Sequence, residues 1–221
     1  MDPEDMKDGL ESVLIRQSIR SVSIADIAMQ HSDNENLYVA PAGRGLADVL
    51  PQLQKKVGSE LLLRRALEKE ADILDFCIID TSPKGDWLTM LAVSAADKLI
   101  IPMPLQRSAT KHILELEERL MEIKENLDVD IETLGFLQCA VDKRDGVENR
   151  RTYWDVLDAF GEDTFLKTII RKSTAIQRAE RSGKSVVDFE PASRGAIDYD
   201  CLSEEVLVRL GLPTQKPKNK R

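Results

Sequence analysis

The segment that decides the fold is DFCIIDTSPKGDWLTMLAVSAADKLIIPMPLQ, residues 75–106. It contains two short apolar runs, at residues 76–79 and 99–101, separated by a stretch long enough for a helix. Short apolar runs that alternate with helical stretches indicate βα units and a mostly parallel sheet. We therefore predict an α/β fold with strands at 73–80 and 98–105 and a helix over 86–95.

The rest of the chain continues this alternation of strands and helices. Further strands are predicted at residues 37–43, 133–142 and 165–170, and helices at 4–17, 23–30, 58–71, 107–126, 148–160, 174–182 and 195–210. The clearest helix is the one at 107–126, where Ile113, Leu116 and Leu120 recur at helical spacing among charged residues. We expect residues 1–212 to form a single α/β domain and the basic tail at 213–221 to be disordered.

The composition is that of a soluble globular protein, with 42% hydrophobic and 32% charged residues in a chain of 221. No apolar run approaches the roughly 18 residues that a membrane-spanning helix needs, and the acidic start MDPEDMKDGL lacks the pattern of a secretory signal. We expect a cytoplasmic protein without membrane attachment.

The cysteines Cys77, Cys139 and Cys201 are odd in number and include no C-x-x-C pair. This pattern argues against a disulfide framework or a zinc site, and it fits a reducing compartment. Because free cysteine behaves as a small hydrophobic residue, we expect all three to be buried.

Basic residues gather in one part of an acidic chain. The net charge is −8, yet Arg171, Lys172, Arg178, Arg181 and Lys184 fall within 14 residues. A local basic face can hold the phosphate backbone of a nucleic acid without sequence preference. The same pattern also occurs on solvated helix faces, so charge alone leaves both interpretations open.

Two short motifs resemble nucleotide-binding signatures but are incomplete. The triplet Gly183-Lys184-Ser185 ends the pattern G-x-x-x-x-G-K-[ST], yet Arg178 stands where its first glycine is needed. The stretch VDKRD at 141–145 resembles the N-K-x-D guanine reader, but Asp142 replaces the amide and removes half of the base-reading groups. We therefore expect neither a phosphate cradle at 183–185 nor a GTPase.

Asp80 ends the predicted strand at 73–80, and open α/β sheets bind their ligands beyond the carboxyl ends of the strands. A carboxylate at this position holds magnesium, usually through water, in P-loop nucleotide hydrolases. An aspartate after a strand is also a common turn former or helix cap. Both roles are open from these residues alone.

Segment 75–106 resembles the Walker B and switch II region of the ParA/MinD family of deviant-Walker P-loop ATPases. There, an apolar strand ending in Asp precedes a Pro-containing loop, a helix ending in Ala-Ala-Asp and a strand ending near Pro, as at Asp80, Asp97 and Pro102. Residues 165–207 are similar to the family's C-terminal pattern, and the matching positions are Gly183, Lys184, Pro191, Ser193, Arg194, Gly195 and Ala196. The resemblance covers about residues 2–210.

The resemblance implies a P-loop NTPase fold of the SIMIBI type and a cytoplasmic, nucleoid-associated homodimer that uses ATP and Mg2+. It also implies non-specific DNA and a centromere-binding partition protein as partners in plasmid or chromosome segregation. Asp80 would hold magnesium through water, and Asp142 and Lys143 would border the adenine. DNA contacts are expected from Arg178, Arg181 and Lys184, followed by Lys172 and Arg194.

The sequence departs from the family at its start. The family's first strand and its loop K-G-G-x-G-K-[ST] do not occur in these 221 residues. We therefore expect a fold truncated at its N-terminus, with an exposed strand edge, and little or no ATP hydrolysis by this chain alone. Two alternatives are a nucleotide-independent DNA-binding or interaction module derived from the fold, and a relative that positions other cargo.

Overall fold

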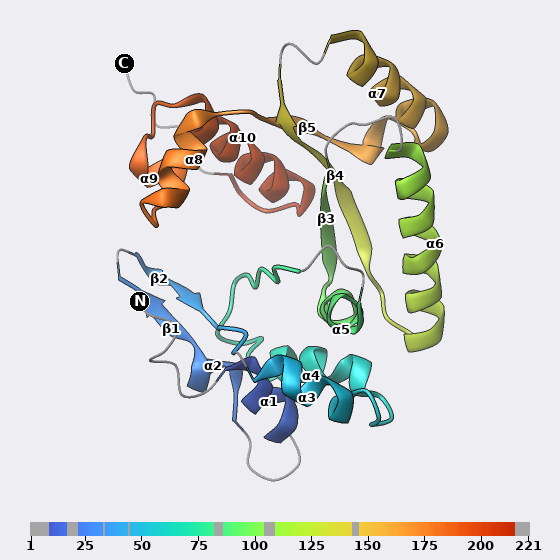
Figure 1. Ribbon diagram of the computed structural model, residues 1–221, viewed down its shortest axis with the longest axis vertical. Coiled ribbons are helices and arrows are strands. Elements are labelled where there is room, and N and C mark those ends of the chain that lie inside the picture. The colour runs from blue at the N-terminus through green and yellow to red at the C-terminus, as the bar shows by residue number, and fades with distance from the viewer. Residues whose placement is uncertain are drawn as a thin grey trace. The chain divides into compact units, whose positions relative to one another are not determined.

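The computed structural model describes residues 9–16, 22–32, 34–43, 45–81, 86–103, 109–142 and 146–214. The chain forms two compact units. The N-terminal unit comprises residues 1–97 and 123–131, and the C-terminal unit comprises residues 98–122 and 132–221. Figure 1 shows the helices and strands of both units.

Short helices form the core of the N-terminal unit. They are α1 (Leu10–Arg16), α2 (Ile24–Ile27), α3 (Leu46–Leu53), the 3-10 turn η2 (Ser59–Leu61), α4 (Leu62–Glu68) and α5 (Trp87–Ala95). Leu14, Leu53, Leu63 and Leu91 are buried together between them. The sequence did not predict α3, because Pro51 lies inside it and proline disfavours a helix interior.

A two-stranded antiparallel hairpin joins β1 (Met29–His31) to β2 (Asn34–Val39). The predicted helix at 23–30 ends early, because Ala28 has an extended backbone with φ −72° and ψ 131°. A strand was correctly expected around residues 37–39, but its pairing is antiparallel. The connection between the two strands is only two residues long, and such a connection can join only antiparallel strands.

The prediction of a buried strand at 73–80 is wrong. The segment forms no strand, and Ile78 is 94% and Phe76 56% exposed. A strand that is apolar on both faces needs partners on both edges and cover on both faces. Within the described residues, no strand pairs with this segment, although Ile79 packs against the core of the N-terminal unit.

The C-terminal unit contains the predicted parallel sheet. The strands β3 (Lys98–Met103), β4 (Glu132–Val141) and β5 (Phe165–Arg171) lie in the order β3-β4-β5. Their parallel connections contain α6 (Ala109–Leu127), and α7 (Gly146–Phe160) with the 3-10 turn η3 (Glu162–Thr164). The expectation of a mostly parallel sheet flanked by helices is confirmed.

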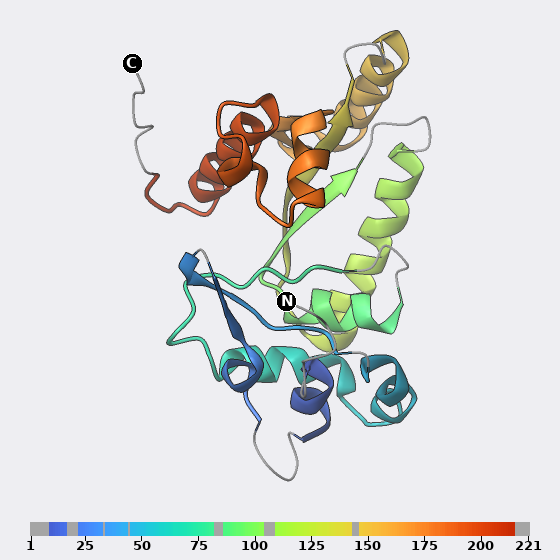
Figure 2. The same cartoon turned by 60° about the vertical axis from the view of Figure 1, so that its left-hand side comes forward.

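Helices cover both faces of this sheet because the apolar side chains of β4 alternate. Phe136 packs with Ile113 of α6 and Val156 of α7. The next residue, Leu137, points to the opposite face, where it packs near Ile176 and Leu202. These two residues belong to α8 (Thr174–Arg181) and α10 (Arg194–Arg209), respectively. Figures 1 and 2 show α6 and α10 on opposite sides of the strands.

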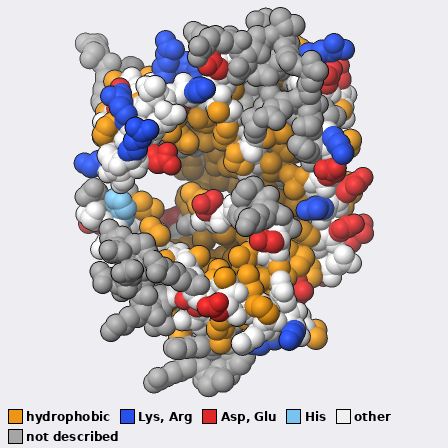
Figure 3. Space-filling model, viewed as in Figure 1, with side chains coloured by type: hydrophobic (Ala, Val, Ile, Leu, Met, Phe, Trp, Pro, Cys, Tyr) orange, Lys and Arg blue, Asp and Glu red, His pale blue; other side chains and the backbone are white. Residues whose placement is uncertain are grey.

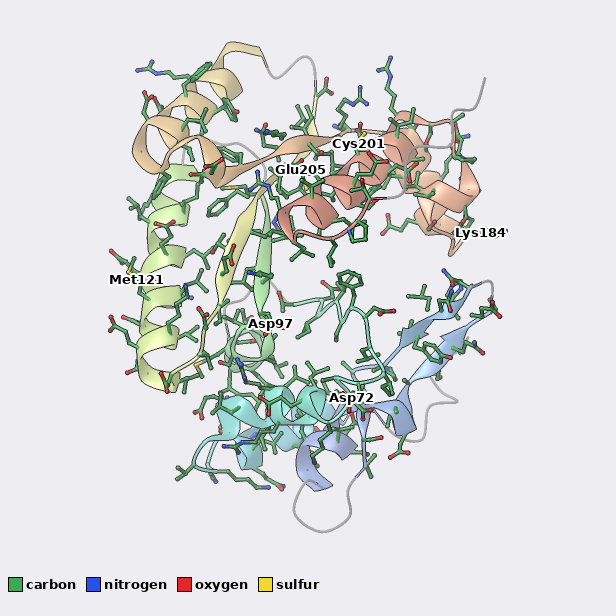
Figure 4. The ribbon with its side chains drawn as sticks, turned by 180° about the vertical axis from the view of Figure 1, so that it is seen from behind. Asp72, Asp97, Met121, Lys184, Cys201 and Glu205 are labelled. Atoms are coloured by element: carbon green, nitrogen blue, oxygen red, sulfur yellow. The ribbon has the colours of Figure 1, made fainter. Side chains whose placement is uncertain are left out.

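Helix α10 binds the backbone of β5 through two carboxylates. Glu205 accepts hydrogen bonds from the backbone N–H groups of Lys167 and Thr168, both at 2.7 Å. Asp198 accepts from the backbone N–H of Arg171 at 2.9 Å and from the guanidinium of the same residue at 2.5 Å. Figure 4 shows Glu205 on α10 beside the strands. Since β5 is the last strand in the order, α10 occupies donors that an edge strand otherwise leaves to solvent.

These hydrogen bonds shift the titration of both carboxyl groups. Burial raises the pKa of Asp198, but the hydrogen bonds from Arg171 outweigh burial and hold it below the ordinary value of 3.8. Burial likewise raises the pKa of Glu205, and the backbone donors of Lys167 and Thr168 bring it below 4.5. A lowered carboxyl pKa stabilises the folded state above the unfolded pKa, and this stabilisation is lost as pH falls through the folded value.

Among the described residues, no helix is both long enough and apolar enough to cross a membrane.

We predict that replacing Asp198 by Asn together with Glu205 by Gln lowers the free energy of unfolding at pH 7. The expected loss is about 1–3 kcal/mol for each side chain, because each buried carboxylate accepts charge-assisted hydrogen bonds. The wild-type free energy of unfolding should also fall more steeply between pH 5 and pH 3 than that of the double variant. Urea unfolding at several pH values measures both effects.

The matched control replaces two other acids of α10, Asp200→Asn and Glu204→Gln, for which no hydrogen bond to β5 is recorded. This control should keep both the stability at neutral pH and the steep acid dependence. Equal acid slopes in the wild type and in the Asp198→Asn/Glu205→Gln variant would contradict the prediction.

Candidate functional site

The candidate site is the exposed basic surface formed by α8 and the turn that follows it. Helix α8 starts at the cap Ser173, whose side chain accepts a hydrogen bond from the Ala175 N–H at 3.3 Å. Ala175 and Ala179 are buried against Val186 and Ala196. Because these small residues fix one face of α8 against its neighbours, the other face is left to solvent.

Three cations lie on the exposed side of this segment: Arg178, Arg181 and Lys184. Arg178 and Arg181 are three residues apart and therefore share a helix face. Lys184 follows in the turn, and Figure 4 shows it where α8 meets α9 (Val186–Phe189). In Figure 3, Lys and Arg side chains gather over α8 and α9. We call these three residues the basic cluster.

The turn at Gly183-Lys184 is not a phosphate cradle. Gly183 has a φ of 65°, the left-handed conformation that commonly ends a helix at glycine. The N–H groups of Gly183 and Lys184 donate to the carbonyls of Glu180 and Ala179 at 3.0 and 3.1 Å. A phosphate loop needs free backbone N–H groups, and these two are already engaged.

One member of the basic cluster is paired with an acid. The Arg178 guanidinium contacts the Glu190 carboxylate at 2.5 Å, and both side chains remain partly exposed, at 58% and 41%. Glu190 directly follows α9, so this ion pair connects α8 to the segment that leads into α10. The sequence gives no warning of the pair, because its partners lie twelve residues apart across a turn.

The two secondary DNA candidates lie on other elements. Lys172 is exposed at the end of β5, and its N–H donates to the carbonyl of Val141 at 3.0 Å. This hydrogen bond places Lys172 at the carboxyl edge of the sheet, next to Asp142. Arg194 is exposed at the first position of α10, just after its cap Ser193.

The predicted nucleotide residues are divided between the two units. Asp142 is half-buried after β4 in the C-terminal unit, and Lys143 lies outside the described residues. Asp80 belongs to the N-terminal unit, where it is exposed at the end of the unpaired segment 73–80.

The described residues do not by themselves provide a magnesium site. Within them, no group of three or more His, Cys, Asp or Glu side chains could hold a metal ion. Asp80 contributes a single exposed carboxylate, so these residues do not fit a bound Mg2+–ATP without further ligands. The magnesium role of Asp80 stays a prediction.

The cysteines do not form a site either. All three are free, but Cys77 and Cys201 are exposed, and only Cys139 is partly covered. The expectation that all three are buried was therefore wrong. Cys77 is exposed because the segment that carries it is not part of the sheet.

Comparison with known proteins identifies the family. A family model described as an AAA domain matches residues 2–133, and proteins named Soj and ParA align with most of the chain. The chain belongs to the ParA/MinD-type family of P-loop ATPases. The family expectation drawn from segments 75–106 and 165–207 is thus confirmed.

Two relatives by sequence are named for cellular roles. The sporulation initiation inhibitor protein Soj of Bacillus subtilis is 28% identical over 90% of this chain and 79% of its own length. The chromosome partitioning protein ParA of Myxococcus xanthus is 27% identical over 78% of this chain, but over only 60% of its own length. The chain therefore spans well under the full length of that ParA.

A solved structure shares the fold. Cobyrinic acid a,c-diamide synthase of Mycobacterium smegmatis, determined with an ATP analogue and magnesium, matches with a TM-score of 0.67 and 24% identity. The match covers 83% of this chain and 77% of the synthase chain. At this level of identity, the likeness supports the α/β fold of the family.

A close helix contact fixes the orientation of α8 relative to α10. A Cβ atom at Gly195 would lie 2.7 Å from Cγ1 of Ile176 and 3.3 Å from Oγ of Ser173. Only a residue without a side chain allows α10 to approach α8 this closely.

We predict that Gly195→Ala lowers the free energy of unfolding by about 1–3 kcal/mol, because the added methyl group overpacks the contact. Thermal unfolding followed by circular dichroism measures the loss. In an Ile176→Ala background, which removes the nearest obstructing atom, the same substitution should cost less. An equal cost in both backgrounds would show that this contact is not the cause.

Proposed function

We propose that this protein is a ParA-like partition protein and that its basic cluster binds non-specific DNA. The observation that carries the proposal is the exposed cluster itself, with Arg178, Arg181 and Lys184 on the solvent side of α8 and its following turn. The family and the relatives named for chromosome partitioning support the cellular role.

The cluster suits phosphates better than base edges. Arginine and lysine bind phosphate oxygens, and each phosphate that they neutralise releases a condensed counterion. The protein as a whole carries a net charge of −8 and therefore repels DNA at long range. At physiological ionic strength, charges are screened beyond about 8 Å, so the local cluster dominates once DNA is in contact.

ATP and Mg2+ enter the proposal through the family. The synthase that shares the fold was determined with an ATP analogue and magnesium. In this chain, the family resemblance makes Asp80, Asp142 and Lys143 the candidate nucleotide and magnesium residues. We further propose that residues 1–221 alone do not hydrolyse ATP. They contain no K-G-G-x-G-K-[ST] loop, which supplies most of the positioning and charge stabilisation in phosphoryl transfer.

The proposed setting is that of a partition system. We propose a cytoplasmic, nucleoid-associated homodimer that works with a centromere-binding partner. The second candidate function is a nucleotide-independent DNA-binding module. This second function is favoured because contacts among α8, α9 and α10 themselves hold the basic cluster in place.

We predict that the wild-type chain binds a duplex of arbitrary sequence at 50 mM salt and loses affinity steeply as salt increases. The variant Arg181→Ala/Lys184→Ala should bind more weakly, and its slope of log K against log salt should be shallower by about 1.8, or about 0.9 per lost phosphate contact. Fluorescence anisotropy over a salt series measures both quantities.

The control removes the same charge from α6 through Lys111→Ala/Lys124→Ala. This variant should keep the wild-type salt slope. If both double variants weaken binding equally, the effect is one of net charge, and the assignment to α8 and its turn is wrong.

We predict no ATP turnover by the isolated chain and no effect of ATP on its DNA affinity. Calorimetry with ATP and magnesium, combined with a phosphate-release assay, checks the first part, and anisotropy with and without ATP checks the second. Phosphate release from ATP that is lost in Asp80→Ala would contradict the proposed lack of hydrolysis by these residues. An ATP-dependent increase in DNA affinity would exclude the nucleotide-independent module.

A further inference from the structure

The ion pair between Arg178 and Glu190 lies within the surface assigned to DNA. Arg178 presents its guanidinium to the Glu190 carboxylate at 2.5 Å. The backbone of Glu190 is held on both sides, because its N–H donates to the Val186 carbonyl at 3.0 Å and its own carbonyl accepts from the Ser193 N–H at 2.9 Å. The acid is therefore anchored beside the cation.

We propose that Glu190 is an intramolecular competitor for phosphate at Arg178 and so sets the DNA affinity of the basic cluster. The inference rests on the proposed DNA binding and adds a residue that determines its strength. Carboxylates and phosphates use the same guanidinium donors, often through two parallel hydrogen bonds. DNA can engage Arg178 fully only after the Glu190 carboxylate has been displaced.

The exposure of the pair makes this competition reversible. Both side chains are more than one-third exposed, and exposed ion pairs are weak. A DNA phosphate can therefore displace the carboxylate. The displaced carboxylate stays nearby because its backbone is anchored, and it then repels the bound phosphate. Glu190 thus lowers DNA affinity both by holding Arg178 and by its own negative charge.

Other acids near the cluster are engaged differently or lie elsewhere on the surface. The Asp188 carboxylate accepts a hydrogen bond from Oγ of Ser185 at 2.8 Å, as part of the cap of α9. Glu180 is exposed on α8 itself, between the two arginines in sequence. Among the described residues, Glu190 is the acid whose carboxylate contacts a cation of the basic cluster directly.

The test is a double-mutant cycle on Glu190→Gln and Arg178→Ala, with DNA affinity measured by anisotropy. Glutamine keeps the size of the side chain but removes its charge. We expect Glu190→Gln to raise the association constant on the order of fivefold and to steepen the salt slope by about 0.9, because one more phosphate is neutralised. Arg178→Ala should weaken wild-type binding, because it removes one cation of the basic cluster, and it should abolish the gain in the Glu190→Gln background.

The control Glu118→Gln removes one exposed acid from α6 and makes the same change in net charge. The inference is overturned if Glu190→Gln gives no gain, if its gain survives Arg178→Ala, or if Glu118→Gln matches it. These outcomes are separable from failure of the proposed function. If Arg181→Ala/Lys184→Ala weakens DNA binding while Glu190→Gln leaves the DNA affinity unchanged, only the proposed role of Glu190 is wrong. If the wild type does not bind DNA even at 25 mM salt, both proposals are wrong.

Discussion

The attachment of α10 to β5 is the interaction on which the rest of the C-terminal unit depends. Glu205 and Asp198 lie seven residues apart on one face of the helix and accept backbone N–H groups from both halves of the strand. Arg209 continues the same face and donates to the carbonyls of Leu134 and Phe165 at 2.7 and 2.6 Å. The helix therefore holds the edge strand and its neighbour β4 together, and it covers one face of the sheet.

This attachment also positions the basic cluster. Helix α8 begins three residues after the end of β5, and its small residues pack against the start of α10 at Gly195 and Ala196. Because α8 is fixed to β5 at its start and packs against α10, the opposite side of α8 faces solvent. The cations of the helix lie on this exposed side. The segment that leads from α8 through α9 to α10 also places Glu190 next to Arg178. Residues 165–209 thus contain the attachment of α10 to β5, the exposed basic cluster and the acid that is paired with Arg178.

Much of this fold could be predicted from sequence where local pattern was enough. The strong periodicity at 107–126 correctly indicated α6, and the apolar runs at 98–105, 133–142 and 165–170 indicated the three parallel strands. The apolar run at 73–80 led to a wrong strand prediction. Apolar content shows that a segment could form a strand, but it does not show that neighbouring strands are available to pair with it. For the site, charge clustering indicated the cations but not the acid paired with Arg178. The burial of Asp198 could have been expected from the sequence, because Asp198 lies in line with Leu202 on the packed face of α10.

DNA binding by the basic cluster is tested most directly by an NMR titration of the labelled chain with a short DNA duplex of arbitrary sequence at low salt. If the basic cluster binds DNA, chemical-shift changes should concentrate at Arg178, Arg181 and Lys184, extend to Glu190 as its ion pair is displaced, and leave α6 unchanged. Shift changes centred on α6, or a titration without changes in α8 and its following turn, would contradict it.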